Sequence, residues 1–367
     1  THSSDWFRHG HHSDKTYDSV ILHVVSEADT EITRSNGEQI PQLLLTCPEN
    51  VQSHYHELCV ADHYPACYPI LASLPKLTIH SWLTALQTER LEQKAQLIMQ
   101  RLELCNNNWE DAFFITLARN FGFGLNGDTF ETWAGLLPFR AMDKHRNDLF
   151  QIEAFFYGLA GLLEETFLKK EQEDEYSLRL CKEFRYLQRK FEIGQGMDAT
   201  LWRFLRLRPE NFPHIRLAQL AYLYQKGDKL FSRLLEAETL ADVRTLLDAR
   251  TSPYWENHYL FGRPSSQKEK TMGERSKDLI IINTVVPFLY TYGLHKADER
   301  MCERAGRFLE ELKAENNHII RSWSDAGLPV VSAADSQALI QLQKEYCDKR
   351  KCLYCRFGYE YLKHTKI

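Results

Sequence analysis

Residues 9–23 place four histidines and two aspartates directly beside an apolar segment. An imidazole titrates near neutral pH, and both imidazoles and carboxylates bind divalent ions or relay protons. Such a group at the end of a buried strand is typical of a catalytic or metal-binding corner. The sequence therefore predicts catalytic or metal-ligating roles for four of these residues. They are His9, His11, Asp14 and Asp18.

A structural interpretation of the same corner stays open. The spacing H-x-H-x-x-D is less specific than a zincin-type signature. In this second interpretation Asp5 and Asp14 cap turns, and His23 is a core histidine whose hydrogen bonds are satisfied. His11 and His12 then face solvent. A purification-tag remnant is disfavoured, because a tag would not interleave aspartate, tryptophan and tyrosine with its histidines.

Three cysteines near the end of the chain, Cys347, Cys352 and Cys355, follow the spacing C-x4-C-x2-C among lysines and arginines. Nearby cations favour the thiolate form, and C-x2-C is a common chelate for zinc or an iron–sulfur cluster. A closed site needs a fourth ligand, for which Cys181, Cys302 or a histidine is a candidate. We expect a metal centre here, and three unligated thiols are the alternative.

Four arginines interleave with phenylalanines over residues 203–219 and lead into a helix that we expect to begin near Pro213. Basic side chains near a helix N-terminus suit a phosphate group, so we predict contacts with a nucleic-acid backbone. The alternative is that Pro209 and Pro213 shape a turn while the arginines pair with nearby glutamates. The arginines are Arg203, Arg206, Arg208 and Arg216.

A small sheet is predicted to position the histidine corner. Val20–Val25 is a short, β-branched apolar run and reads as a buried strand. Glu31–Thr46 reads as a hairpin, because Asn36-Gly37 is a strong turn signal between two apolar segments. Three strands bury little surface alone, so we expect further strands or packed helices.

The remaining chain predicts a helical body. Cys47–Pro75 contains four prolines and reads as a linker; its cysteines and histidines lack a C-x-x-C pair, which disfavours zinc there. Ile79–Cys105 is amphipathic, and Asn108 is the expected N-cap of the next helix. Arg146–Phe167 is a further expected helix, and Tyr254–Ser276 a polar surface loop. We therefore predict an α+β chain with a β-rich module over residues 1–75 and a helical domain over 76–367.

Charge and composition narrow the class of protein. The 367 residues are 43% hydrophobic and carry a net charge of −5, which disfavours a broadly basic nucleic-acid coat. Residues 1–50 hold three basic and eight acidic side chains, while the other 317 residues hold 42 of each. No run of about 18 apolar residues predicts a membrane span, and no signal peptide is visible. Nine scattered cysteines favour a reducing cytoplasm.

Several segments, taken together and in order, resemble an uncharacterised bacterial family known only as a domain of unknown function. They span nearly the whole chain, which makes the resemblance specific. The matching segments are SDWFRHGHHSDKTYDSVILHVV, WEDAFFITLARNFGFG, KHRNDLFQIEAFFYGLAGLL, RPENFPHIRLAQLA, INTVVPFLYTYG and ADSQALIQLQKEYCDKRKCLYC.

The resemblance implies that members extend upstream of Thr1, with a Gly-Pro-Asp-Phe turn and a Val-Glu-Ile-His strand leading into Ser4, Asp5 and Trp6. An aspartate followed by a glutamate on the next strand resembles the layout of PD-(D/E)XK nucleases, some of which also hold a cysteine-bound iron–sulfur cluster. It implies a truncated restriction-endonuclease-like core that uses Mg²⁺ or Mn²⁺ to activate water. His2 lies near the position where that layout has a lysine.

Two functions follow from these observations. The first is a metal-dependent phosphodiesterase that acts on nucleic acid, with the histidine corner completing the active site and the arginines holding the backbone. The second is a non-enzymatic helical scaffold that binds nucleic acid or protein, with a purely structural corner.

Overall fold

The computed structural model describes residues 1–363 except 64, 166, 169, 171, 172 and 228. The chain separates into two units. Unit 1 comprises residues 1–75, 325–328 and 343–367, and unit 2 comprises residues 76–324 and 329–342. Helices dominate the described residues, whose strands form two small sheets of two strands each, which agrees with a large helical body.

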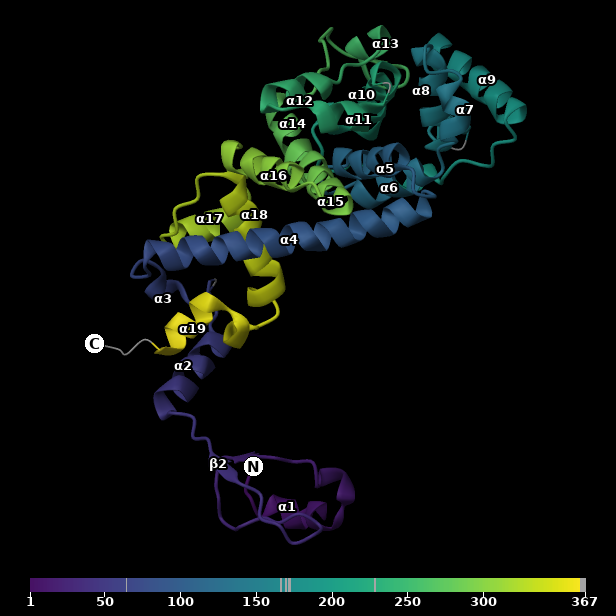
Figure 1. The fold of residues 1–367 in the computed structure, drawn as a ribbon. Coiled ribbons are helices and arrows are strands. Elements are labelled where there is room, and N and C mark those ends of the chain that lie inside the picture. The colour runs from purple at the N-terminus through teal and green to yellow at the C-terminus, as the bar shows by residue number, and fades with distance from the viewer. Residues whose placement is uncertain (64, 166, 169, 171–172, 228, 364–367) are drawn as a thin grey trace. The chain divides into compact units, whose positions relative to one another are not determined.

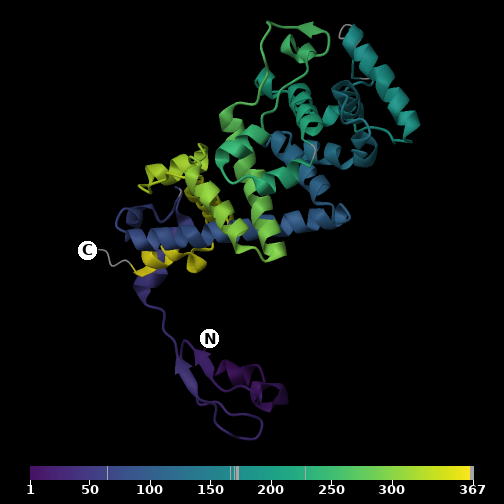
Figure 2. The ribbon, with the colours of Figure 1, turned by 45° about the horizontal axis from the view of Figure 1, so that its top comes forward.

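Parallel segments form the sheet at the start of unit 1. Strand β1 (His23–Val25) pairs with β2 (Gln42–Leu44) in parallel, with His23 opposite Gln42, and their two arrows lie side by side in Figure 2. A parallel bridge between His2 and Glu27 adds the first residues to this array. The expected strand from Val20 is therefore shorter than its apolar run, because only three of its residues pair.

The turn signal at Asn36-Gly37 is confirmed. Gly37 has a φ of 83° and donates its N–H to the carbonyl of Arg34 at 3.0 Å, while Thr33 and Gln39 form an antiparallel bridge. The left-handed φ suits glycine, which lacks the Cβ that would oppose it. The segment after this turn supplies β2, which pairs with β1 rather than extending a long hairpin.

The expectation of a linker over Cys47–Pro75 is wrong. Helices α2 (Glu49–Val60) and α3 (Tyr68–Leu71) occupy it, and helix α19 (Arg356–Lys363) packs against both of them (Figure 1). His54 Nδ1 lies 3.3 Å from the carbonyl of Leu362, and the Tyr361 hydroxyl donates to a carboxylate oxygen of Glu57 at 2.9 Å. Residues 343–367 therefore group with residues 1–75, although the sequence division placed them with the helical body.

Unit 2 is a layered helical body around one aromatic core. Trp133, Trp255 and Trp323 are fully buried in it, along with many phenylalanines. Its larger helices are α4 (Lys76–Leu104), α5 (Trp109–Phe121), α6 (Gly127–Gly135), α8 (Leu149–Leu159), α9 (Glu175–Lys190), α10 (Pro213–Lys226), α15 (Val286–Lys296), α16 (Glu299–Glu311), α17 (His318–Asp325) and α18 (Ala333–Gln341).

Shorter elements complete unit 2. The π-helix η6 joins α14 to α15, and β3 and β4 form an antiparallel pair within the stretch predicted as a loop from Tyr254. These shorter elements are α7 (Phe139–Asp143), α11 (Leu230–Glu236), α12 (Leu240–Leu246), α13 (Pro253–Glu256), β3 (His258–Leu260), β4 (Arg263–Pro264), α14 (Glu274–Ile280) and η6 (Ile281–Val285).

Local chemistry sets the helix ends of unit 2. The Asn108 side chain accepts hydrogen bonds from the first turn of α5, which confirms the expected cap. The helix expected over Arg146–Phe167 ends early, at Leu159. Gly161 has a φ of 72°, and a Cβ there would lie 2.2 Å from the carbonyl oxygen of Met197, so the chain turns where only glycine fits. None of the described helices is long and apolar enough to cross a membrane.

Candidate functional site

Aromatic packing around Trp6 organises the histidine corner. Trp6 follows the start of helix α1 (Asp5–Arg8), is 4% exposed, and donates its indole N–H to the carbonyl of Thr33 at 3.0 Å. The rings of His11 and His23 each lie 5.3 Å from the Trp6 ring, and His11 lies 4.0 Å from Tyr17. These imidazoles therefore help to cover a buried indole.

The two aspartates of the predicted site are engaged in local turns. Asp14 accepts the Thr16 N–H at 2.9 Å and also the Thr16 hydroxyl, and these bonds lower the pKa of Asp14. Asp18 accepts the Ser35 hydroxyl at 2.6 Å and the Ser35 N–H at 2.9 Å, which lowers its pKa as well. Both carboxylates thus stabilise the backbone in the way that turn-capping residues do.

The structure brings together only part of the predicted catalytic set. The rings of His9 and His11 lie 5.8 Å apart, and His11 is close enough to Asp14 to contribute to its lowered pKa. Asp18 instead ties residues 17–19 to the hairpin turn. Burial, and then the neighbouring His11, lower the pKa of His23. The geometry matches the structural interpretation at Asp14 but not at His23, whose Nδ1 is buried without a hydrogen-bond partner among the described residues.

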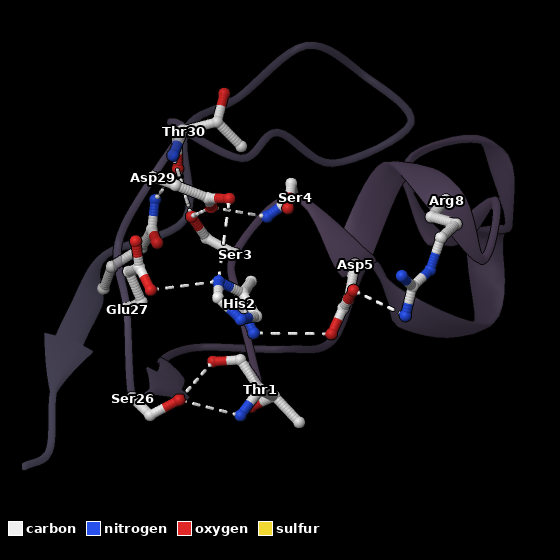
Figure 3. Close-up of polar contacts among 11 residues, drawn as sticks. Thr1, His2, Ser3, Ser4, Asp5, Arg8, Ser26, Glu27, Asp29 and Thr30 are labelled. Carbon is white, nitrogen blue, oxygen red and sulfur yellow. Dashed lines mark hydrogen bonds and ion pairs between the residues drawn. The ribbon is translucent and has the colours of Figure 1, made fainter.

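A second polar cluster, which sequence reasoning did not single out, ties residues 1–5 to residues 26–30 (Figure 3). His2 Nδ1 lies 3.2 Å from a carboxylate oxygen of Glu27 and 4.0 Å from one of Asp29. Asp29 accepts the Ser3 hydroxyl at 2.7 Å and the Ser4 N–H at 2.8 Å. Hydrogen bonds from Ser4 and Ser3 hold the pKa of Asp29 far below its usual range.

The predicted arginine patch divides into an exposed and a buried part. Residues 203–208 form a loop, which we call the arginine loop, and Arg203, Arg206 and Arg208 are exposed on it. Two aromatic side chains flank the first of them: Trp202 is buried and donates to the carbonyl of Ala160 at 2.9 Å, and Phe204 packs on other aromatic rings. The loop is therefore fixed at its base.

Arg216 has a different environment from the other three arginines. It is buried on α10, its guanidinium lies 4.4 Å from the centre of the Phe123 ring, and it donates to Gln219 and Asn211 at 2.8 and 2.5 Å. Burial lowers its pKa to about 10. The prediction that Arg216 contacts nucleic acid does not fit this position, because a buried guanidinium cannot reach the phosphate backbone of a nucleic acid.

The C-terminal cysteines lie near a fourth cysteine, Cys67, to which the sequence analysis assigned no role. Cys67 precedes α3, and Cys355 precedes α19, the helix that packs against α3. Both side chains are 7% exposed. Burial, followed by the nearby thiols of Cys67, Cys355 and Cys352, raises the pKa of Cys347 well above its usual value. The four cysteines therefore lie in one neighbourhood of unit 1, in which Cys67 and Cys355 are buried and Cys347 and Cys352 are partly buried.

The two cysteines proposed as a fourth ligand lie elsewhere. Cys181, on α9, has its sulfur 3.4 Å from the carbonyl oxygen of Leu163, and Cys302, on α16, has its sulfur 3.7 Å from that of Tyr290. Both residues belong to unit 2. Neither is among the thiols that raise the pKa of Cys347, whereas Cys67 is.

The described part of the chain contains no group of three or more histidine, cysteine, aspartate or glutamate side chains that could hold a single metal ion. All nine cysteines are among the described residues, and none forms a disulfide. The predicted Mg²⁺ or Mn²⁺ site and the zinc or iron–sulfur site remain predictions.

A cavity of about 1120 Å³ opens in unit 2 between α5, α7, α10 and α11. Asp111 lines it, and burial together with the charges of Asp143 and Glu110 raises the pKa of Asp111 to about 6. The Tyr224 hydroxyl donates to Asp143 at 2.7 Å. Lysines and an arginine also line the cavity, so it combines both signs of charge. Its other charged residues are Lys144, Arg146, Lys226 and Lys229.

A buried carboxyl group lies in the core of unit 2. Glu153, on α8, is fully buried, and burial raises its pKa to about 7. The Tyr176 hydroxyl donates to Glu153 and lies 3.3 Å from the Ser252 hydroxyl. The burial of Glu153 could not be predicted, because a single glutamate within an apolar helix has the same sequence pattern whether it faces the core or solvent.

Sequence signals for the missed residues differ in strength. Cys67 lies in a Cys- and His-containing stretch, but 280 positions separate it from Cys347, so spacing could not join them. Asp111 was expected only as an acidic residue in the first turn of a helix. A hydrophobic-pattern argument locates helices but does not show which of them enclose a cavity.

The chain was compared with known proteins. A search of curated proteins found no match. A search of solved structures likewise found none. A family model described as "Protein of unknown function (DUF2851)" matches residues 1–318, a range that contains the histidine corner, the arginine loop and Cys67 and ends before Cys347. The chain therefore belongs to this family of proteins of unknown function, DUF2851.

Proposed function

We propose that the chain binds the phosphate backbone of a nucleic acid through the arginine loop. The observation that carries the proposal is the exposure of Arg203, Arg206 and Arg208 on one loop with a fixed base. Arginine is well suited to phosphate, because its planar guanidinium donates several hydrogen bonds and stays charged. In this proposal the histidine corner is structural and the helical body is a scaffold.

Local electrostatics support the loop as an anion-binding surface. Glu210, the nearest acidic residue downstream, pairs with Lys268, and this bond lowers the pKa of Glu210. Among the described residues, none of the three loop arginines forms an ion pair within 4.0 Å, although the charge of Arg208 contributes to lowering the pKa of Glu210. Leu205 is 82% exposed between them and offers an apolar contact for a sugar or base.

Backbone conformation adds a second argument. Arg206 has a φ of 66°, in the left-handed region that most residues avoid. Such strain is commonly stored where a side chain must be held in a particular direction. Arg206 is exposed, so the strained residue presents its side chain to solvent.

The test measures binding of labelled single-stranded DNA, double-stranded DNA and RNA by fluorescence anisotropy over a range of salt concentrations. Replacing Arg203, Arg206 and Arg208 together by alanine should weaken binding by at least tenfold near 0.1 M salt. Each lost phosphate contact should also reduce the slope of log K against log salt by about 0.7 to 0.9.

Two variants make this test specific. Arg300, on α16, is also highly exposed, so Arg300→Ala removes the same charge elsewhere and should leave binding unchanged. Arg206→Gly removes the loop charge while easing the backbone strain, and should weaken binding as Arg206→Ala does. An unchanged salt slope in the triple variant would refute the proposal.

A metal-dependent phosphodiesterase is a second candidate, favoured by the placement of Glu27 and Asp29 around His2 at the end of parallel segments (Figure 3). Paired carboxylates bind Mg²⁺ or Mn²⁺, which activates water for phosphodiester cleavage. In this candidate His9 and His11 would carry protons beside the metal. A restriction-endonuclease-like core would be the corresponding fold.

Cleavage of labelled DNA and RNA with Mg²⁺ or Mn²⁺ tests the second candidate. Glu27→Gln and His11→Ala should each abolish cleavage, while Glu38→Gln, on the exposed hairpin, should not. Binding without cleavage would leave the scaffold proposal standing alone. We infer a reducing compartment such as the cytoplasm for either function, because none of the nine cysteines forms a disulfide.

A further inference from the structure

We propose that unit 1 holds an iron–sulfur cluster ligated by Cys67, Cys347, Cys352 and Cys355. This inference goes beyond the proposed binding of nucleic acid and does not depend on it. It rests on the convergence of four cysteines, two buried and two partly buried, from two segments of the chain. Residues 67 and 347 are 280 positions apart, so a tertiary arrangement brings them together.

Helix packing establishes this convergence. Cys67 is the N-cap residue of α3, and Cys355 ends the short 3-10 helix η8 (Cys352–Tyr354) immediately before α19. Helix α19 packs against α3, against α2 and against η8, and the three α-helices lie side by side in Figure 1. The residues that begin α3 and α19 are thereby brought to one side of the same small group of helices.

A tight backbone loop holds the other two cysteines. Arg350 donates its N–H to the carbonyl of Cys347 at 3.0 Å, and Cys355 donates to the carbonyl of Cys352 at 3.2 Å. The guanidinium of Arg350 donates to the carbonyl of Leu58 on α2 at 3.0 Å, which fastens the loop to that helix. Gly358 lets α19 approach the Cys352 carbonyl, since a Cβ there would lie 2.2 Å from its oxygen.

Burial separates these thiols from solvent to different degrees. Cys67 and Cys355 are buried, and Cys347 and Cys352 are partly buried. Protonated thiols crowded into a dry site contribute little to stability. A metal centre would convert them into ligands, because a bound cation offsets the cost of each thiolate.

The chemistry of the donor set points to a cluster rather than a single zinc ion. A tetrahedral zinc site holds four sulfurs at about 2.3 Å from one ion. The described cysteines are not grouped at such distances. A cluster attaches its cysteines to different iron atoms and therefore spreads them further apart. The spacing C-x4-C-x2-C with one distant cysteine also occurs in ferredoxin-type iron–sulfur sites.

Binding balances as a ligand exchange. Each of the four thiols loses one proton to solvent as its sulfur forms a bond to iron. Ferric iron, ferrous iron and sulfide, supplied from outside the chain, assemble the inorganic core at its resting oxidation level, so no further oxidant is needed. The thiols themselves are neither oxidised nor reduced, and the same four sulfur atoms remain attached to the chain after the cluster is removed.

Cys59 provides a matched control. It lies on α2 in the same unit and is near Cys352, whose pKa it helps to raise after burial. It does not contribute to the raised pKa of Cys67 or of Cys347. A fifth thiol at the edge of the neighbourhood should therefore be dispensable. Cys47, which is exposed, is a second control.

The experiment uses the full chain purified without oxygen and reconstituted with ferric iron, ferrous iron and sulfide. Iron, acid-labile sulfide and zinc are measured per chain, together with visible absorption and electron paramagnetic resonance after reduction. We expect stoichiometric iron and sulfide with broad visible absorption. Cys67→Ser and Cys355→Ser should each lose most of this signal, while Cys59→Ser and Cys47→Ser retain it.

Circular dichroism and tryptophan fluorescence of each variant separate loss of the cluster from loss of the fold. A cluster-free variant that keeps its fold should retain both signals. Chelation of iron from the wild-type chain gives a second measurement that needs no mutation, and it should expose Cys67 to thiol labelling. Zinc in place of iron, no bound metal, or a cluster that survives Cys67→Ser would overturn the proposal.

Discussion

Unit 2 buries three whole tryptophans and a continuous set of aromatic and aliphatic side chains, whereas unit 1 has small, separate apolar contacts. In unit 1, Trp6 packs with Ile32 and Ile40, and many residues of the β1–β2 region leave apolar side chains exposed. Below a certain size an apolar core cannot offset the loss of chain entropy. A small unit therefore gains more from a metal centre than a large one does.

A substitution in the core of unit 2 tests the difference in apolar burial between the two units most directly. Trp133 is fully buried and donates its indole N–H to the carbonyl of Phe156 at 3.0 Å. Trp133→Ala should lower the free energy of unfolding of unit 2 by about 3 to 5 kcal/mol, because it leaves a cavity and an unpaired carbonyl. Urea denaturation followed by circular dichroism measures the change.

Leu205→Ala is the control for this large effect. Leu205 is a large apolar residue in the same unit, but it lies in solvent on the arginine loop. Its replacement should change the free energy of unfolding by less than about 0.5 kcal/mol. Equal losses in the two variants would contradict a stability based on the buried aromatic core.

The pH dependence of stability offers the next test. The pKa of Glu153 is raised above its ordinary value to about 7 by burial, so the folded state keeps its proton while the unfolded state has lost it. The free energy of unfolding should therefore fall as pH rises from about 4.5 to 7, by about 3 kcal/mol for this group, and stay lower above pH 7.

Glu153→Gln removes that titration. An amide oxygen can still accept the Tyr176 hydroxyl, so the variant should keep the fold and show a flatter pH profile. The profiles of wild type and variant should meet near pH 4 and diverge progressively between about pH 4.5 and 7. Parallel profiles over the whole range would show that another group controls the pH dependence.

A smaller change in stability is expected in unit 1, where a substitution tests whether this unit unfolds separately from unit 2. Gly358→Ala places a Cβ 2.2 Å from the Cys352 carbonyl, so α19 must move away from η8. We expect a loss of about 1 to 3 kcal/mol confined to this unit. Hydrogen exchange should speed up in residues 347–363 while α5 and α8 keep their protection.

Gly306→Ala supplies the contrasting variant. Gly306 lies within α16 with open space around it, so alanine should be tolerated and should stabilise the helix by roughly 0.5 to 1 kcal/mol. Faster exchange across the whole chain in Gly358→Ala would mean that the two units do not unfold separately.

Sequence reasoning succeeded where local physics decides the outcome. The Asn108 cap, the long helix near Ile79 and the turn at Gly37 all follow from interactions within a few residues. It failed where distant contacts decide. Arg206 and Arg216 are the same residue type ten positions apart, yet one is exposed and one is buried, because α10 is surrounded by other elements on nearly every side.

The candidate site shows the same division. That Asp14 would cap a turn could be anticipated from its neighbours, since the capping partner is two residues away. The meeting of Cys67 with the C-terminal cysteines could not, because no periodicity or spacing rule spans 280 residues. Likewise, the raised pKa of Asp111 depends on Asp143, which another helix supplies.

The split of unit 1 across the sequence has a consequence for how the protein is made. A ribosome completes residue 75 long before it reaches residue 343, and at about 5 to 20 residues per second the interval is roughly 15 to 50 seconds. During that time α2 and α3 have emerged but lack α19. The surfaces of α2 and α3 that contact α19 therefore stay exposed on the nascent chain until residues 356–363 are made. Truncated translation products would expose these surfaces permanently.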